Sequence, residues 1–219
     1  MLGQLLNGVT THPILGDGFE GPPGHISLAE DSPYIEQFAT ATQQELNDLI
    51  NRIHDEQGVT WSLSGDRENR VALYRQNEKY MREGRTVHIG LDINAPAGTP
   101  LHAPLDATVV DAQYEEGAGN YGWMCVLRCE IGGGKPPFYL LFGHLAEEGL
   151  APAGTKLCAG DVFAKIGDFH ENGNWFNHTH LQVLTKRAFD MDWNKGLVRP
   201  DEVATLDEFC PSPMPLLRV

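Results

Sequence analysis

From Thr86 onward, short β-like segments alternate with turns rich in Gly and Pro, and no helical periodicity separates them. Strands at such close spacing, without helices between them, favour antiparallel pairing of neighbours. We therefore expect a mainly β protein with an antiparallel β-sheet core. The expected strands are 86–94, 101–112, 122–130, 137–145, 161–167 and 178–185.

The two ends of the chain lack this pattern. Residues 1–32 are rich in Gly and Pro and predict an irregular arm. The second half of 33–56 has the apolar spacing of a helix that would end at Gly58, with one stripe formed by Leu46, Leu49, Ile50 and Ile53. The proline-rich end of the chain predicts a tail anchored on the core by Trp193, Phe209 and Leu216.

These patterns divide the chain into three regions. Residues 1–84 are expected to form an N-terminal arm and helical extension, residues 85–185 the β core, and residues 186–219 a C-terminal tail packed on that core. A length of 219 residues suits one domain with such additions.

Charge and hydropathy exclude two classes of partner. The formal charge is −14, from 16 basic and 30 acidic side chains, and a surface this acidic repels nucleic acid. The longest apolar run is 138–142, far below the roughly 18 residues of a membrane span. Nothing in the sequence sets the oligomeric state.

Four scattered cysteines and the N-terminal sequence favour a cytoplasmic protein. Cys125 and Cys129 lie four residues apart in one expected strand, about 13 Å apart, which is too far for a disulfide. The first residues carry no Lys or Arg before an apolar stretch, so we expect no secretory signal; a secreted or periplasmic location is the alternative if a signal has been removed. Free thiols fit a reducing compartment.

Three histidine motifs carry the chemical signal. His88 and Asp92 would stand about 13 Å apart in a regular strand, but Gly90 between them permits a bend that brings them together. His178 and His180 share one strand face about 7 Å apart, and His144 ends the most apolar strand. Two histidines and a carboxylate plus water form a common catalytic zinc set. Nearby histidines that do not bind the metal can move protons.

Together these motifs resemble the lysostaphin/LytM-type zinc endopeptidases. That family shows H-x-x-x-D, a His-Leu pair and H-x-H in this order, and here these match His88 with Asp92, then 144–145, then 178–180. An Ala-Pro-Ala-Gly-Thr-Pro turn at 95–100 also matches. Arg85-Thr86-Val87-His88, Ile166-Gly167-Asp168 and Cys210-Pro211-Ser212-Pro213 further resemble the peptidase-like middle domain of kinase–peptidase–aminotransferase fusion proteins.

The resemblance implies a site and an activity. It implies that His88, Asp92 and His180 bind Zn2+ and that His144 and His178 are the catalytic histidines. It implies a lysostaphin/LytM-like fold and a metalloendopeptidase whose metal-activated water hydrolyses peptide bonds. The implied substrate is a peptide or muropeptide with small residues.

Two departures from the family leave other functions open. Gln182 stands where the family has Glu, so the second-shell charge near His180 differs, and Ala146 replaces a serine. The alternatives are a zinc-binding but inactive module that binds or scaffolds peptides, a cupin-like iron or manganese enzyme, and a purely structural β protein. Trp175 and Phe176 are expected to pack beside the cleft, and His102 to be structural.

Overall fold

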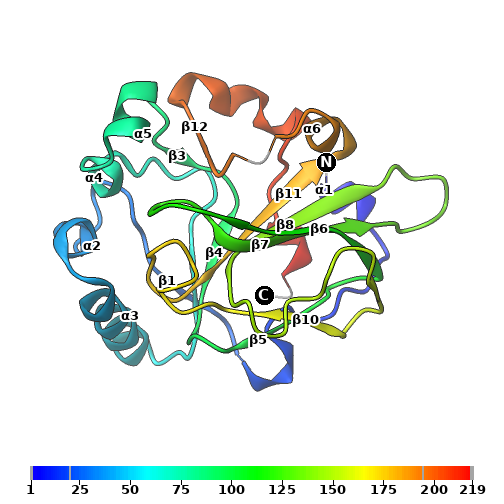
Figure 1. The fold of residues 1–219 in the computed structure, drawn as a ribbon, viewed down its shortest axis with the longest axis horizontal. Helices are drawn as coiled ribbons and strands as arrows, with labels where there is room; N and C mark the ends of the chain where they lie inside the picture. The colour runs from blue at the N-terminus through cyan, green and yellow to red at the C-terminus, as the bar shows by residue number, and fades with distance from the viewer. Residues whose placement is uncertain (1, 20, 194, 218–219) are drawn as a thin grey trace.

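The fold is organised around one eight-stranded sheet (Figure 1) in a computed structural model that describes residues 2–19, 21–193 and 195–217. In sheet order the strands are β1 (Gly24–His25), β2 (Ser62–Ser64), β4 (Leu91–Asn94), β11 (Thr179–Thr185), β8 (Phe138–Leu145), β7 (Gly122–Cys129), β6 (Ala107–Glu115) and β9 (Lys156–Leu157). All neighbours pair antiparallel except β1 and β2, which are parallel. The predicted β-rich core is confirmed, and the sheet is mixed only at that edge.

Two of the expected strands are each divided in two. The expected strand 86–94 forms β3 (Val87–His88) and β4, and the expected strand 101–112 forms β5 (Pro100–His102) and β6. β3 pairs with β12 (Leu197–Val198), and β5 pairs with β10 (Val162–Lys165), in two small antiparallel sheets. The first division falls at Gly90, whose φ of 105° lies in the left-handed region that glycine tolerates.

β8 is buried on both of its faces, which explains why it carries the longest apolar run. Phe138, Leu140 and Phe142 point into one core cluster, which also includes Leu127 of β7 and Leu216 of the tail. The residues between them point into a second cluster, on which the tail packs through Ala188, Val198, Leu206 and Cys210. The predicted anchoring of the tail is thus observed, and Trp193 and Phe209 stack with ring centroids 4.5 Å apart.

Four helices of the N-terminal region lie together on one side of the molecule (Figure 1): α2 (Ile35–Thr40), α3 (Gln43–Gln57), α4 (Val71–Tyr74) and α5 (Glu78–Glu83). α3 begins in a capping box between Thr42 and Glu45 and ends at Gly58, which has a φ of 67°. Its predicted apolar stripe is buried in a cluster with Phe38 and Phe176. The expected helix therefore exists, and it supports Phe176 from outside the sheet.

The remaining elements are short. They are α1 (Leu2–Leu5), α6 (Lys186–Asp190) and the 3-10 helices Gly16–Gly18, Pro200–Glu208 and Met214–Leu216. Residues 1–84 supply β1 and β2 to the main sheet, and Leu2 and Leu6 to its core, so this region is continuous with the β core; the division at residue 84 stays a prediction. Within the described ranges, none of the helices has the length and apolar character of a membrane span.

Candidate metal centre and its pocket

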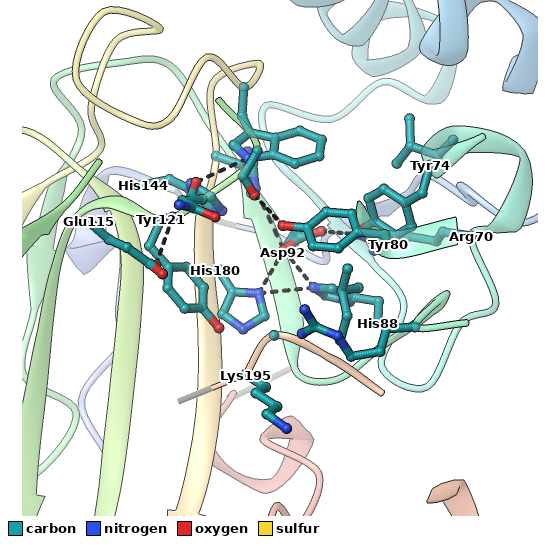
Figure 2. A pocket seen from close by; sticks show the side chains of 18 of the residues that line it. Arg70, Tyr74, Tyr80, His88, Asp92, Glu115, Tyr121, His144, His180 and Lys195 are labelled. Carbon is teal, nitrogen blue, oxygen red and sulfur yellow. Dashed lines mark hydrogen bonds and ion pairs between the residues drawn. The ribbon is translucent and has the colours of Figure 1, made fainter. Parts of the chain in front are cut away.

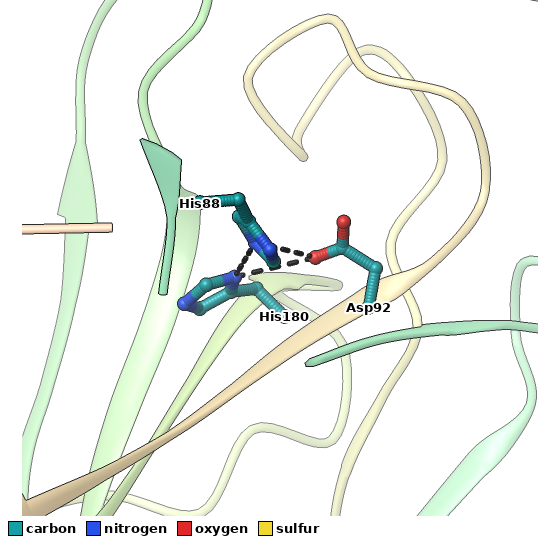
Figure 3. A group of neighbouring side chains, drawn as sticks. All are labelled: His88, Asp92 and His180. Atoms are coloured by element: carbon teal, nitrogen blue, oxygen red, sulfur yellow. Dashed lines mark hydrogen bonds and ion pairs between the residues drawn. The ribbon is translucent and has the colours of Figure 1, made fainter. Parts of the chain in front are cut away.

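Three predicted ligands meet at one point of the sheet. His88 ends β3, Asp92 lies in β4, and His180 lies in β11 directly opposite Asp92 in the strand register. His88 Nε2 lies 2.9 Å from His180 Nδ1 and 3.2 Å from Asp92 Oδ1, and His180 Nδ1 lies 3.3 Å from Asp92 Oδ1 (Figure 3). Side chains 92 positions apart in sequence thus form one compact donor set.

The bend at Gly90 makes this convergence possible. A Cβ at this position would lie 2.5 Å from the carbonyl oxygen of Leu181 and 3.2 Å from the ring of His180. The Gly90 N–H donates to Asp66 Oδ1 at 3.1 Å, which holds the bend in place. The predicted role of the glycine is therefore observed, because only a residue without a side chain fits between the two ligands.

The donor set fits a tetrahedral zinc ion. Zinc bonds of about 2.0–2.1 Å at tetrahedral angles place ligand atoms about 3.4 Å apart, close to the spacing of these three atoms. His88 Nδ1–H donates to the carbonyl of Gly65 at 3.0 Å, which leaves the lone pair on Nε2. His180 Nε2–H donates to Gln182 Oε1 at 3.2 Å, which leaves the lone pair on Nδ1. Both free lone pairs therefore face Asp92 Oδ1.

Asp92 is held in its charged form. Burial alone would raise its pKa, but the His88 ring and the Arg70 guanidinium outweigh burial, and its pKa lies well below the ordinary value. Arg70 Nη1 donates to the second carboxylate oxygen, Oδ2, at 2.6 Å. An ionised carboxylate is the form that binds a metal ion.

The two predicted catalytic histidines stand beside the donor set. The ring centroids of His144 and His178 are 4.4 Å apart, and His178 Nε2 lies 3.7 Å from Asp92 Oδ1. His144 Nδ1–H donates to the carbonyl of Asn172 at 2.7 Å, and His178 Nδ1–H to the carbonyl of Phe176 at 2.8 Å. Each ring therefore presents an unprotonated Nε2.

Burial sets the charge state of both rings. It lowers the pKa of His178 to about 4, and it lowers the pKa of His144 well below the ordinary value, so both are neutral at pH 7. All five predicted site residues are between 1% and 6% exposed. His144 also has a φ of 62°, in the left-handed region, and its backbone N–H donates to the carbonyl of Tyr121. The backbone is thus bent at the point where β8 delivers this ring.

The site opens into a pocket with a cavity volume of about 250 Å³, part of whose wall comes from the N-terminal region. Figure 2 shows Arg70, Tyr74 and Tyr80 on one side of Asp92, with Tyr121 and His144 on the other. Tyr80 Oη donates to the carbonyl of Gly119 at 2.8 Å, which joins α5 to the turn between β6 and β7.

The sequence reasoning did not identify these N-terminal wall residues as part of the site. No sequence pattern singles out Arg70, Tyr74 or Tyr80. No local motif marks them, because they reach the site only through tertiary contacts. Trp175 lies against Tyr74, with ring centroids 6.2 Å apart, and Phe176 is buried beside His178, so the expected aromatic packing is observed.

The other histidines lie away from the donor set. His12 and His102 stack with ring centroids 5.5 Å apart, and His102 Nδ1 bonds to the carbonyl of Gly160. His54 bonds to Ser62, and His170 lies on the exposed loop before β11. All four cysteines are free thiols, in agreement with the prediction for Cys125 and Cys129.

Comparison with known proteins finds a family match over the region that carries the site. Residues 86–191, which include all five predicted site residues, match the model of peptidase family M23. One similar solved structure is a zinc-containing peptidase from Vibrio cholerae, which is 22% identical over 46% of this chain and 28% of that chain, with a TM-score of 0.37. Another is the catalytic domain of the prophage-encoded M23 protein EnpA from Enterococcus faecalis, which is 22% identical over 52% of this chain and 77% of that chain, with a TM-score of 0.37. The catalytic domain of lysostaphin from Staphylococcus simulans is 21% identical over 55% of this chain and 80% of that chain, with a TM-score of 0.35. The chain thus spans well under two thirds of the Vibrio cholerae peptidase, and no curated protein matches it.

Proposed function

We propose that this protein is a zinc-dependent endopeptidase, because residues 86–191 match the model of peptidase family M23. One observation carries the proposal. Three preassembled donor atoms, 2.9–3.3 Å apart, stand beside two neutral imidazoles whose Nε2 atoms are free.

In this proposal, His88 Nε2, Asp92 Oδ1 and His180 Nδ1 hold the metal. A bound zinc ion with an open position would acidify a water molecule and polarise the substrate carbonyl. Gln182 and the carbonyl of Gly65 keep the two ligand rings in the tautomers that binding requires. The neutral amide of Gln182 does this without the second-shell charge that the family's carboxylate would add.

His144 and His178 would move the protons. Because each Nδ1–H is bound to a backbone carbonyl, each ring is fixed in orientation and accepts a proton at Nε2 only. One ring takes the proton of the attacking water and returns it to the nitrogen of the leaving amine. While protonated, its Nε2–H also donates to the oxygen on which negative charge develops.

The pocket favours a substrate with small residues. A volume of about 250 Å³ lies below the 300–1,000 Å³ usual for drug-sized ligands. Tyr80, Tyr121 and Trp175 line this space, so the pocket favours small side chains next to the scissile bond. We therefore propose peptides rich in glycine or alanine, including peptidoglycan-type peptides, as the substrate class.

The test is hydrolysis by the zinc-loaded protein. Pentaglycine, alanine-containing peptides and purified muropeptides are incubated with it, and the products are identified by chromatography and mass spectrometry. We expect cleavage that chelation abolishes and zinc restores. Asp92→Ala and His180→Ala should both lose zinc, as measured by elemental analysis.

Other outcomes would select an alternative. Wild-type stoichiometry of zinc in both variants would show that the assigned ligands are wrong. Zinc-loaded protein that binds these peptides and cuts none would be an inactive peptide-binding module. Iron in place of zinc in the purified protein would favour a cupin-like enzyme.

A further inference from the structure

A buried arginine from the N-terminal region contacts the carboxylate of the metal centre. Arg70 Nη1 donates to Asp92 Oδ2 at 2.6 Å, and the two side chains are 3% and 2% exposed. The other carboxylate oxygen, Oδ1, is the one that faces His88 and His180. The two oxygens of Asp92 are therefore divided between a guanidinium and the donor set.

Arg70 is itself fixed by a chain of polar contacts. Its Nε donates to Glu68 Oε2 at 2.9 Å, and the other oxygen of Glu68 accepts from Ser27 Oγ and from the Leu28 N–H, both at 3.0 Å. An arginine with carboxylates on two of its nitrogens has little freedom to rotate. Arg70 and Glu68 thus connect Asp92 by hydrogen bonds to the segment that precedes α2.

The backbone around Arg70 is also paired with the strand that carries His88. The Arg70 N–H donates to the carbonyl of Thr86, and the His88 N–H donates to the carbonyl of Glu68. The Arg67 N–H in turn donates to the carbonyl of His88. Residues 67–70 therefore hold one proposed ligand through its backbone and another through its side chain, and they lie outside the region 86–191 that matches the family.

We propose that Arg70 is a positioning residue of the metal centre, which holds Asp92 so that it offers one oxygen to the metal. A carboxylate free to rotate can bind a metal through both oxygens and so take up an additional coordination position. With Oδ2 engaged by Arg70, Asp92 would offer Oδ1 alone to a bound metal, and a coordination position would stay open for water. The segment 67–70 is then a structural part of the metal centre.

The charges in this cluster are consistent with that role. Arg70 stands between the carboxylates of Asp92 and Glu68, of which Glu68 is also largely buried. With zinc bound, the ion neutralises Asp92 and the guanidinium neutralises Glu68. Removal of the guanidinium would leave Glu68 without its partner, and it would release Asp92 Oδ2.

The proposal rests on the zinc site of the proposed function and is tested by metal binding, without reference to hydrolysis. Arg70→Met and Arg70→Lys are made in the full chain, with Arg75→Met as the matched control. Arg75 lies in the same region but pairs with Glu36 on the surface, where its side chain is 40% exposed. Zinc affinity is measured by competition with a chromophoric chelator, and the coordination geometry by the visible absorption spectrum of the cobalt(II) form.

We expect a graded loss of metal affinity. Removal of a contact to a ligating side chain typically weakens metal binding by about 10–100-fold, so Arg70→Met should fall in that range and change the cobalt spectrum. Arg70→Lys should lose less, because an ammonium still reaches one carboxylate but not both. Arg75→Met should match the wild type in affinity and spectrum.

A second variant keeps the test decisive if Arg70→Met does not fold, as judged by circular dichroism. Glu68→Gln keeps the shape of the anchor but removes its charge, and it should weaken zinc binding several-fold with an altered cobalt spectrum. Wild-type zinc affinity and a wild-type cobalt spectrum in a folded Arg70→Met, or in Arg70→Lys and Glu68→Gln together, would overturn the proposal. A wild-type protein that binds no zinc would instead overturn the metal assignment itself.

Discussion

Removal of zinc should lower the melting temperature of this protein, because the donor set exists only in the folded chain. His88 and His180 are 92 residues apart in sequence and come together only when β11 pairs with β4. The unfolded chain cannot present the same three donors at one point. Zinc at the proposed site would therefore bind the folded state preferentially and stabilise it.

The size of the effect follows from linkage and from chain length. Free zinc at 1,000 times its dissociation constant adds about 4.1 kcal/mol to the free energy of unfolding, and each further tenfold adds about 1.4 kcal/mol. For a chain of 150–250 residues, 1 kcal/mol shifts the melting temperature by about 2–4 °C. We therefore expect a shift of about 8–16 °C between chelated and zinc-saturated protein of this 219-residue chain.

The assay is calorimetry in zinc-buffered solutions across several decades of free zinc. Asp92→Asn keeps the shape of the side chain and removes its charge, so its melting temperature should respond much less to zinc. His178→Ala leaves all three ligands in place and should keep the wild-type dependence on zinc. A wild-type melting temperature that does not change from chelator to saturating zinc would refute the reasoning.

Four substitutions and one labelling experiment test other parts of the structure. His144→Ala and His178→Ala should each retain stoichiometric zinc but lower kcat/KM for the cleaved peptide by about 10²–10⁴-fold, and loss of zinc in either would show that it is a ligand. Gly90→Ala should both destabilise the protein and weaken zinc binding, because its Cβ would contact the carbonyl of Leu181 at a φ of 105°; equilibrium unfolding and chelator competition at wild-type values would contradict this. Phe142→Ala should lower the free energy of unfolding by about 3–5 kcal/mol in denaturant titrations, since the ring is fully buried. A thiol reagent should rapidly label Cys158 alone, because the other three thiols are buried and burial raises their pKa values; fast labelling at a second site in native protein would disagree.

Local patterns were sufficient to predict the β core, and the resemblance to the lysostaphin/LytM-type endopeptidases singled out five side chains that the fold brings close together. Strand segments with alternating or continuous apolar side chains stand out in a single sequence, as β7, β8 and β11 did, because their burial depends on the side chains themselves. His88 with Asp92, and His178 with His180, were recognised because their spacing and order are local properties. The bend at Gly90 was expected for the same reason, since glycine marks a backbone that departs from a regular strand.

Local sequence patterns could not predict the shortest strands or the N-terminal residues that line the pocket. β1 and β2 contain two and three residues, too few to show a periodicity, and they join the sheet through pairing with distant segments. The division between β5 and β6 likewise follows from their separate partners, β10 and β7.

The amino-acid sequence by itself determined the chemistry of this protein: which groups can bind a metal, which can carry a proton, and which segments must be buried. Only the tertiary structure decided that Arg70 holds Asp92 and that Tyr80 closes one side of the pocket. The physical reason is that a side chain's charge and shape are local, whereas the partner it meets depends on how segments 16 or more residues apart are brought together. Here that is the pairing of residues 67–70 with the strand of His88.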